Sequence, residues 1–130
     1  MFVDILTSIN NNDPLKDVYE GGRLVDLDIP SPYLTGVFDD IIANNTGYVF
    51  NGTLETNRGC PFACTFCDWG SLTYAKIKKF PIPKVIQELT WMAENQIDYV
   101  TIADANFGVF TDRDMEVTEK LVDLQNEYGY

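Results

Sequence analysis

The sequence contains no histidine and only three cysteines in 130 residues, so few side chains can serve as soft metal ligands. Basic residues are also scarce, because 9 Lys and Arg stand against 20 Asp and Glu and give a net charge of −11. A surface this acidic disfavours nucleic acids and anionic membranes, which both bind clustered Lys and Arg. No apolar run approaches the roughly 18 residues of a membrane span, and the N-terminal stretch has no basic signal-peptide region. We therefore expect a cytoplasmic protein with reduced thiols, bound to neither nucleic acid nor membrane.

All the cysteines lie close together, at Cys60, Cys64 and Cys67, in the spacing C-x3-C-x2-C. Small and turn-forming residues between them allow the backbone to curl, so three thiolates can converge on one metal centre. Thiolate sulfur is the ligand that iron–sulfur clusters and zinc select. A closed zinc site needs four ligands, so zinc would have to recruit Asp68 or a partner protein. A four-iron cluster held by three cysteines instead leaves one iron open to a small molecule.

This spacing, with Phe66 directly before the last cysteine, resembles the cluster motif of radical S-adenosylmethionine (SAM) enzymes. In that family the amino and carboxylate groups of SAM chelate the open iron, and an electron from the cluster cleaves SAM to a 5′-deoxyadenosyl radical. The resemblance implies that Cys60, Cys64 and Cys67 bind a 4Fe-4S cluster. It further implies that Phe66 lies beside the adenine, and that an electron donor such as a flavodoxin or ferredoxin is a partner.

Asp104 and Asn106 follow a second strand-like segment, residues 98–103. The radical SAM family usually carries a glycine-rich segment here, with a glutamate that holds the SAM amino group, and this sequence departs from that pattern. Asp104 and Asn106 are the polar groups available to accept hydrogen bonds from the ammonium, and the run Asp-x-Asn-Phe resembles the version used by the cobalamin-binding branch. The alternative is that both residues only cap the turn after the strand, as Asp and Asn commonly do.

Residues 1–46 are predicted to form a lead-in segment. Prolines at positions 30 and 32 stiffen the chain into an extended conformation, and apolar residues at helical spacing predict a short helix at about 33–43. Residues 29–36 also resemble the linker that enters the radical SAM core in the cobalamin-binding branch. The preceding residues are too few for a cobalamin domain and include no histidine to ligate cobalt, so we expect no cobalamin in this chain.

Residues 47–130 are predicted to form two strand–helix units, with strands at 53–57 and 98–103 and helices at 84–95 and from Thr111 to Tyr128. Thr111 and Asp114 fit a capping box for the second helix. This order predicts an α/β fold, namely an incomplete barrel of the radical SAM type. The family core has about six units of roughly 30 residues each. We therefore expect a fragment or truncated product, which a companion chain would complete.

The sequence thus predicts an iron–sulfur protein that cleaves SAM reductively to start radical chemistry on an unidentified substrate. The alternative is a non-catalytic iron–sulfur or zinc-binding module left by truncation. An electron-carrying ferredoxin is disfavoured, because such clusters normally take four cysteines.

Overall fold

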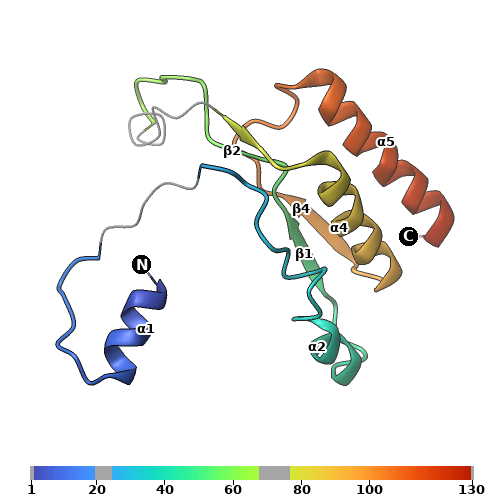
Figure 1. The fold of residues 1–130 in the computed structure, drawn as a ribbon. Helices are drawn as coiled ribbons and strands as arrows, with labels where there is room; N and C mark the ends of the chain where they lie inside the picture. Colours follow the sequence, from blue (N-terminus) through green and yellow to red (C-terminus); the bar gives the residue numbers. More distant parts are fainter. Residues whose placement is uncertain (1, 20–24, 68–76, 130) are drawn as a thin grey trace.

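A computed structural model describes residues 2–19, 25–67 and 77–129. Its elements make a mixed α/β fold with two small sheets, in agreement with the predicted fold class. In chain order they are α1 Phe2–Asn10, α2 Asp39–Asn44, β1 Asn51–Leu54, β2 Asn57–Arg58, β3 Lys78–Lys79, α4 Ile82–Glu94, β4 Tyr99–Ile102 and α5 Thr111–Tyr128 (Figure 1).

The centre of the fold is the parallel pair β1 and β4, in which Asn51 lies opposite Tyr99 and Leu54 opposite Ile102. Parallel strands need a crossover connection, and α4 provides it between them. Figure 1 shows α4 against β1, with α5 beside α4. Both predicted strand–helix units are therefore present. The further strands of a barrel stay a prediction, because the described residues form only this two-stranded parallel sheet and a short antiparallel one.

The hydrophobic core lies between the sheet and the two long helices. One face of α4 is buried and mostly apolar, and α5 contributes two fully buried aliphatic side chains. Burying a large aliphatic side chain stabilises a fold by roughly 1.5–3 kcal/mol. The fully buried apolar members are Leu27, Leu54, Val85, Leu89, Met92, Ala93, Val117 and Leu124.

The lead-in helix is shorter than predicted, because α2 begins only at Asp39. Gly36 has a φ of +77°, a left-handed conformation through which an α-helix does not continue. The residues before it form a turn in which the Ser31 carbonyl accepts hydrogen bonds from the Thr35 amide and hydroxyl. Val37, part of the helical pattern in the sequence, is consequently 59% exposed.

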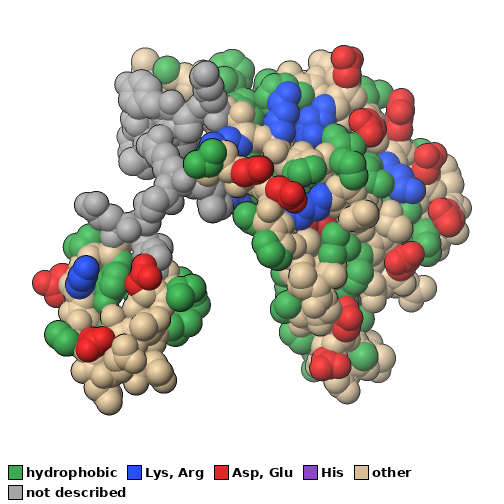
Figure 2. All heavy atoms as spheres, in the orientation of Figure 1, with side chains coloured by type: hydrophobic (Ala, Val, Ile, Leu, Met, Phe, Trp, Pro, Cys, Tyr) green, Lys and Arg blue, Asp and Glu red, His purple; other side chains and the backbone are tan. Residues whose placement is uncertain are grey.

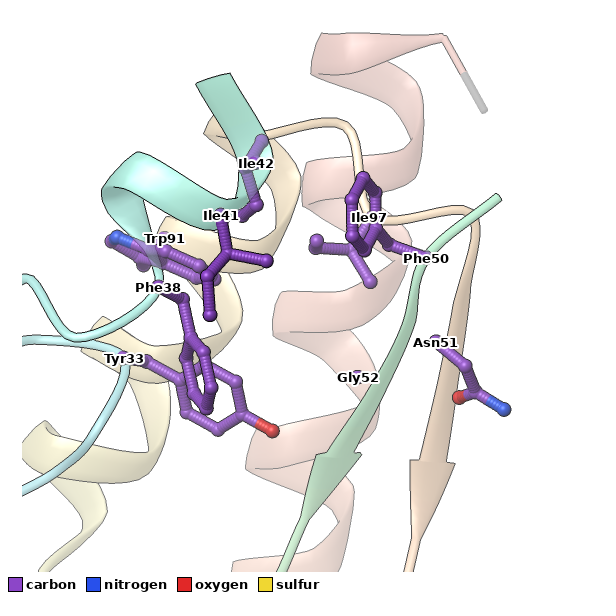
Figure 3. A pocket seen from close by; sticks show the side chains of 9 residues that line it. All are labelled: Tyr33, Phe38, Ile41, Ile42, Phe50, Asn51, Gly52, Trp91 and Ile97. Atoms are coloured by element: carbon purple, nitrogen blue, oxygen red, sulfur yellow. The ribbon is translucent and has the colours of Figure 1, made fainter. Parts of the chain in front are cut away.

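The lead-in packs on α4 and the start of β1 through aromatic rings. The ring centroid of Tyr33 lies 5.3 Å from those of Phe38 and Trp91, within the range of favourable aromatic pairs. Together they border a cavity of about 220 Å³. Figure 3 shows the side chains that line it, which are Tyr33, Phe38, Ile41, Ile42, Phe50, Asn51, Gly52, Trp91 and Ile97. This cavity is mostly apolar and lies at the N-terminal end of β1.

Helix α1 buries none of its residues and lies apart from the other helices in Figure 1. Acidic side chains gather along the face formed by α5 in Figure 2, as the charge of this helix requires. Over the described ranges, no helix is long and apolar enough to cross a membrane.

Candidate functional site

The cysteine loop begins and ends at the antiparallel pair of β2 and β3. Asn57 lies opposite Lys79 and Arg58 opposite Lys78, so the chain leaves and returns at neighbouring positions. The predicted strand at 53–57 was wrong in its bounds: β1 ends at Leu54 and Asn57 belongs to β2, in a second sheet. Only two residues separate β1 from β2, so the chain stops pairing with β4 after Leu54 and enters the second sheet at Asn57.

The three cysteines are free thiols on this loop, with Cys60 half-buried and Cys64 and Cys67 exposed. Gly59, directly before the first of them, has a φ of +114°, which favours glycine. The Cys67 amide donates to the Cys64 carbonyl at 3.2 Å. This hydrogen bond closes a β-turn, whose end residues lie within about 7 Å of each other. The structure therefore brings the backbones of Cys64 and Cys67 together.

The sulfur atoms themselves are not gathered. Within the described parts of the chain, no group of three or more His, Cys, Asp or Glu side chains is arranged to hold a metal ion. The donor set nevertheless fits an iron–sulfur cluster, because three free thiols share one short loop. Metal binding commonly supplies the free energy that organises such ligands. The side chain of Phe66 is 91% exposed, and Asp68 lies outside the described residues.

Asp104 lies at the end of β4 and reaches across to the chain that leaves β1. Its Oδ1 accepts hydrogen bonds from the backbone amides of Thr56 at 2.6 Å and Asn57 at 3.1 Å. Its Oδ2 accepts from the Thr56 hydroxyl and from Asn57 Nδ2, the latter at 2.7 Å. Thr56 and Asn57 are both fully buried. The carboxylate thus joins the base of the cysteine loop to β4.

Arg113, in the first turn of α5, also binds the base of the cysteine loop, at Thr56. Its Nη2 donates to the carbonyl of Thr56 at 2.7 Å and to that of Phe80 at 2.8 Å. Burial lowers the pKa of the Arg113 guanidinium, and the negative charges of Asp114 and Asp104 oppose that shift. The amide of Phe80 also donates to the Thr56 carbonyl, at 3.0 Å. Both ends of the cysteine loop therefore meet at Thr56.

Sequence reasoning missed Thr56, Asn57 and Arg113. The sequence pattern places Thr56 and Asn57 in the predicted strand at 53–57 and Arg113 inside the predicted capping box, and it assigns none of them to the site. No local pattern marks them, because their partners lie 33 to 57 residues away along the chain.

Asn106 and Asp114 shape the turn between β4 and α5. The Asn106 Nδ2 atom is buried and has no hydrogen-bond partner among the described residues. Asp114 Oδ2 accepts from the amides of Gly108 at 2.7 Å and Phe110 at 3.1 Å. The capping box was half right: Asp114 does reach back, but the helix N-cap is Phe110 and Thr111 makes no capping hydrogen bond.

The cysteine loop and this turn both follow the C-terminal ends of the parallel strands, the end at which α/β barrels carry their active sites. The apolar cavity lies at the opposite end of β1, which corresponds to the end at which residues of α/β barrels serve stability. The cysteine loop is therefore the candidate site, and the cavity is part of the lead-in packing.

Two known proteins are similar to this chain. A cobalamin-dependent radical SAM methyltransferase, TokK, from Streptomyces tokunonensis is 42% identical over 105 residues, which are 79% of this chain and 15% of that protein. Over this stretch the chain is related to the radical SAM superfamily. A 2-(S-pantetheinyl)-carbapenam-3-carboxylate methyltransferase from Streptantibioticus cattleyicolor is 39% identical over 105 residues, with the same coverage. No protein-family model matches the chain.

A radical SAM match of 105 residues within 130 must include the cysteine loop, wherever the match begins. The same reasoning places β1, α4 and β4 inside the matched stretch. The chain spans about 15% of the length of the curated relatives it matches.

Proposed function

We propose that this chain binds a 4Fe-4S cluster through Cys60, Cys64 and Cys67 and belongs to the N-terminal part of a radical SAM core. The observation that carries the proposal is the position of three free thiols on one loop, beyond the C-terminal end of β1, in a chain related to a radical SAM methyltransferase. Three thiolates leave one iron to be chelated by SAM. When bound, the cluster supplies the electron for reductive cleavage of SAM.

The chain's own residues position these groups. The exposed ring of Phe66 is available to lie against the adenine of SAM. Asn106, at the end of β4, has a buried amide nitrogen without a partner in the described structure. This N–H group can donate a hydrogen bond to an oxygen of SAM, whereas only the amide oxygen could accept one from the SAM ammonium. The remaining strands of a partial barrel would come from a longer protein or a companion chain. Reduction requires an external donor of the flavodoxin or ferredoxin type.

The reaction class to test first in the whole protein is methyl transfer, because both relatives carry the name methyltransferase. The first is also named cobalamin-dependent. The chain contains no histidine to ligate cobalt, so we propose no cobalamin site within it.

Anaerobic reconstitution with iron, sulfide and a reductant tests the cluster. The purified chain is expected to retain about four irons and four sulfides per molecule, and electron paramagnetic resonance of the reduced protein is expected to change when SAM is added. Serine in place of any one of the three cysteines should abolish both the retention of iron and sulfide and the spectral response to SAM. Thr65→Ala changes an exposed side chain in the same loop without removing a thiol, and it should bind the cluster normally.

The competing function is a metal-binding module without catalysis. A cluster whose spectrum is unchanged by saturating SAM would favour that module, and so would a cluster that forms no 5′-deoxyadenosine with the rest of the protein present. Native protein that contains zinc without iron or sulfide would favour a structural zinc site instead.

A further inference from the structure

The carboxylate of Asp104 has no acceptor position left. An ionised carboxylate offers about four lone-pair sites, and four donors occupy them in pairs on Oδ1 and Oδ2. All four donors belong to Thr56 and Asn57. A SAM ammonium could bind this carboxylate only if it displaced one of them.

Displacing these donors is costly because they are buried. Thr56 and Asn57 are 0% and 1% exposed, so water cannot replace a lost acceptor without movement of the chain. Hydrogen bonds to a charged group are stronger than neutral ones, and a buried donor left without an acceptor carries the full desolvation cost. The arrangement therefore favours a fixed structural position for Asp104.

That position is the base of the cysteine loop. Asn57 begins β2, and the first cysteine follows β2 and Gly59. Because Phe80 and Arg113 also bind the Thr56 carbonyl, movement of Thr56 displaces the returning end of the loop as well. The hydrogen bonds of Asp104 therefore help to fix the positions of both ends of the segment that carries the three cysteines.

We propose that Asp104 is a positioning residue for the cysteine loop, acting through Thr56 and Asn57, and that it does not itself bind SAM. This inference rests on the proposed function for its relation to the cluster. It goes further by assigning the end of β4 the task of fixing the direction in which Cys60 leaves the sheet.

Two variants separate positioning from direct binding. Thr56→Val removes one donor and leaves the Asp104 carboxylate in place, whereas Asp104→Asn turns one acceptor oxygen into an amide. If Asp104 positions the loop, both variants should lose iron to a chelator about tenfold faster than the wild type, the effect of one lost hydrogen bond to a charged group. Per cluster retained, the affinity for SAM should stay within about twofold.

A third variant tests whether the pattern of donors matters. In Asn57→Asp combined with Asp104→Asn, the new amide can donate to the new carboxylate across the same gap, and the net charge is unchanged. The double variant should recover part of the cluster retention lost in Asp104→Asn. Recovery is not expected if the carboxylate at position 104 is itself the SAM ligand.

Controls distinguish loop positioning from general loss of stability. Thr53→Val makes the same substitution at an exposed position on β1 and should behave as the wild type. Leu121→Ala trims the partly buried packing of α5 and should lower the unfolding temperature without accelerating iron loss. Hydrogen exchange of the metal-free chain adds a readout that needs no cluster: Thr56→Val and Asp104→Asn should raise exchange at residues 56–60 and 77–80 and leave α5 unchanged.

The results decide between the two roles. The positioning role would be overturned if Asp104→Asn weakened SAM binding more than about tenfold while both Asp104→Asn and Thr56→Val kept the iron retention and hydrogen exchange of the wild type. Unchanged behaviour of both variants would overturn it too. Failure of the proposed function is read separately, in a wild-type chain that retains no iron and sulfide, and the hydrogen-exchange comparison still tests positioning in that case.

Discussion

Tyr33 and Thr53, separated by twenty residues, exchange two hydrogen bonds at the edge of β1. The Tyr33 hydroxyl donates to the Thr53 carbonyl at 2.8 Å and accepts from the Thr53 amide at 3.0 Å. Phe50 and Leu54 bond toward β4, and alternate residues of a strand bond to opposite sides, so Thr53 faces the other edge. One phenol thus takes the place of a neighbouring strand. Exposed strand edges tend to pair with other chains. Because the Tyr33 hydroxyl occupies this edge of β1, further strands can join the sheet only on the β4 side.

Replacing Tyr33 with Phe tests this contact. Loss of the hydroxyl leaves the Thr53 amide and carbonyl to water, and we expect the free energy of unfolding to fall by about 0.5–1.5 kcal/mol. Urea unfolding followed by circular dichroism measures it. Tyr48→Phe removes the hydroxyl of a 73% exposed side chain and should change stability by less than about 0.5 kcal/mol. Equal effects of the two variants would show that the hydrogen bonds at Thr53 contribute nothing.

The same edge contact shows how far the sequence could lead. Helical and alternating patterns predicted α4, β4 and α5 nearly at their observed bounds. Each helix buries an apolar face, and the alternate residues Val100 and Ile102 of β4 are half-buried. The lead-in was predicted less well, since Leu34 and Val37 fit a helical spacing while the turn at Gly36 leaves both exposed. Tertiary packing of Tyr33 on Trp91 decides that segment, and a local pattern does not contain it.

The sequence predicted the candidate cluster ligands, but it did not predict the residues that position the loop carrying them. The cysteine spacing identified the loop and the superfamily from local sequence. Asp104 was placed correctly at the end of β4, but whether its carboxylate faces a ligand or the neighbouring strand depends on contacts 47 and 48 residues away. The convergence of the three thiols remains a prediction, because the described residues do not gather them.

The start of α5 provides a second prediction, with its control in the same helical turn. Asp114 is 3% exposed and accepts two backbone hydrogen bonds, whereas Asp112 is exposed. Both carboxylates lie at the positive end of the helix dipole and gain a similar amount from it, about 0.3–1 kcal/mol. Asp114→Ala should therefore destabilise the chain by about 1–3 kcal/mol more than Asp112→Ala, because it removes two hydrogen bonds from backbone amides to a buried charged group. Thermal unfolding compares them, and similar midpoints would refute the role of Asp114.

Gly52 provides the third prediction, because β1 packs directly on α4 at this residue. A Cβ built at Gly52 would lie 3.0 Å from the sulfur of Met92 and 3.2 Å from Cγ2 of Ile97. Contacts this short require the side chain of Met92 or Ile97 to shift by a few tenths of an ångström, and overpacking typically costs about 1–3 kcal/mol. Gly52→Ala should lower the free energy of unfolding by an amount in this range, measured by urea denaturation.

Combining Gly52→Ala with Met92→Ala tests whether the cost arises from this contact. Met92 is fully buried, and the single variant Met92→Ala should create a cavity that destabilises the chain by about 2–5 kcal/mol. The space left beside Gly52 should accommodate the added methyl group, so the double variant should be more stable than the sum of the two single effects predicts. Neighbouring residues commonly show coupling of about 0.5–3 kcal/mol. Strict additivity would mean that the cost of the added methyl group does not arise from packing on Met92, which leaves the contact with Ile97 as its source.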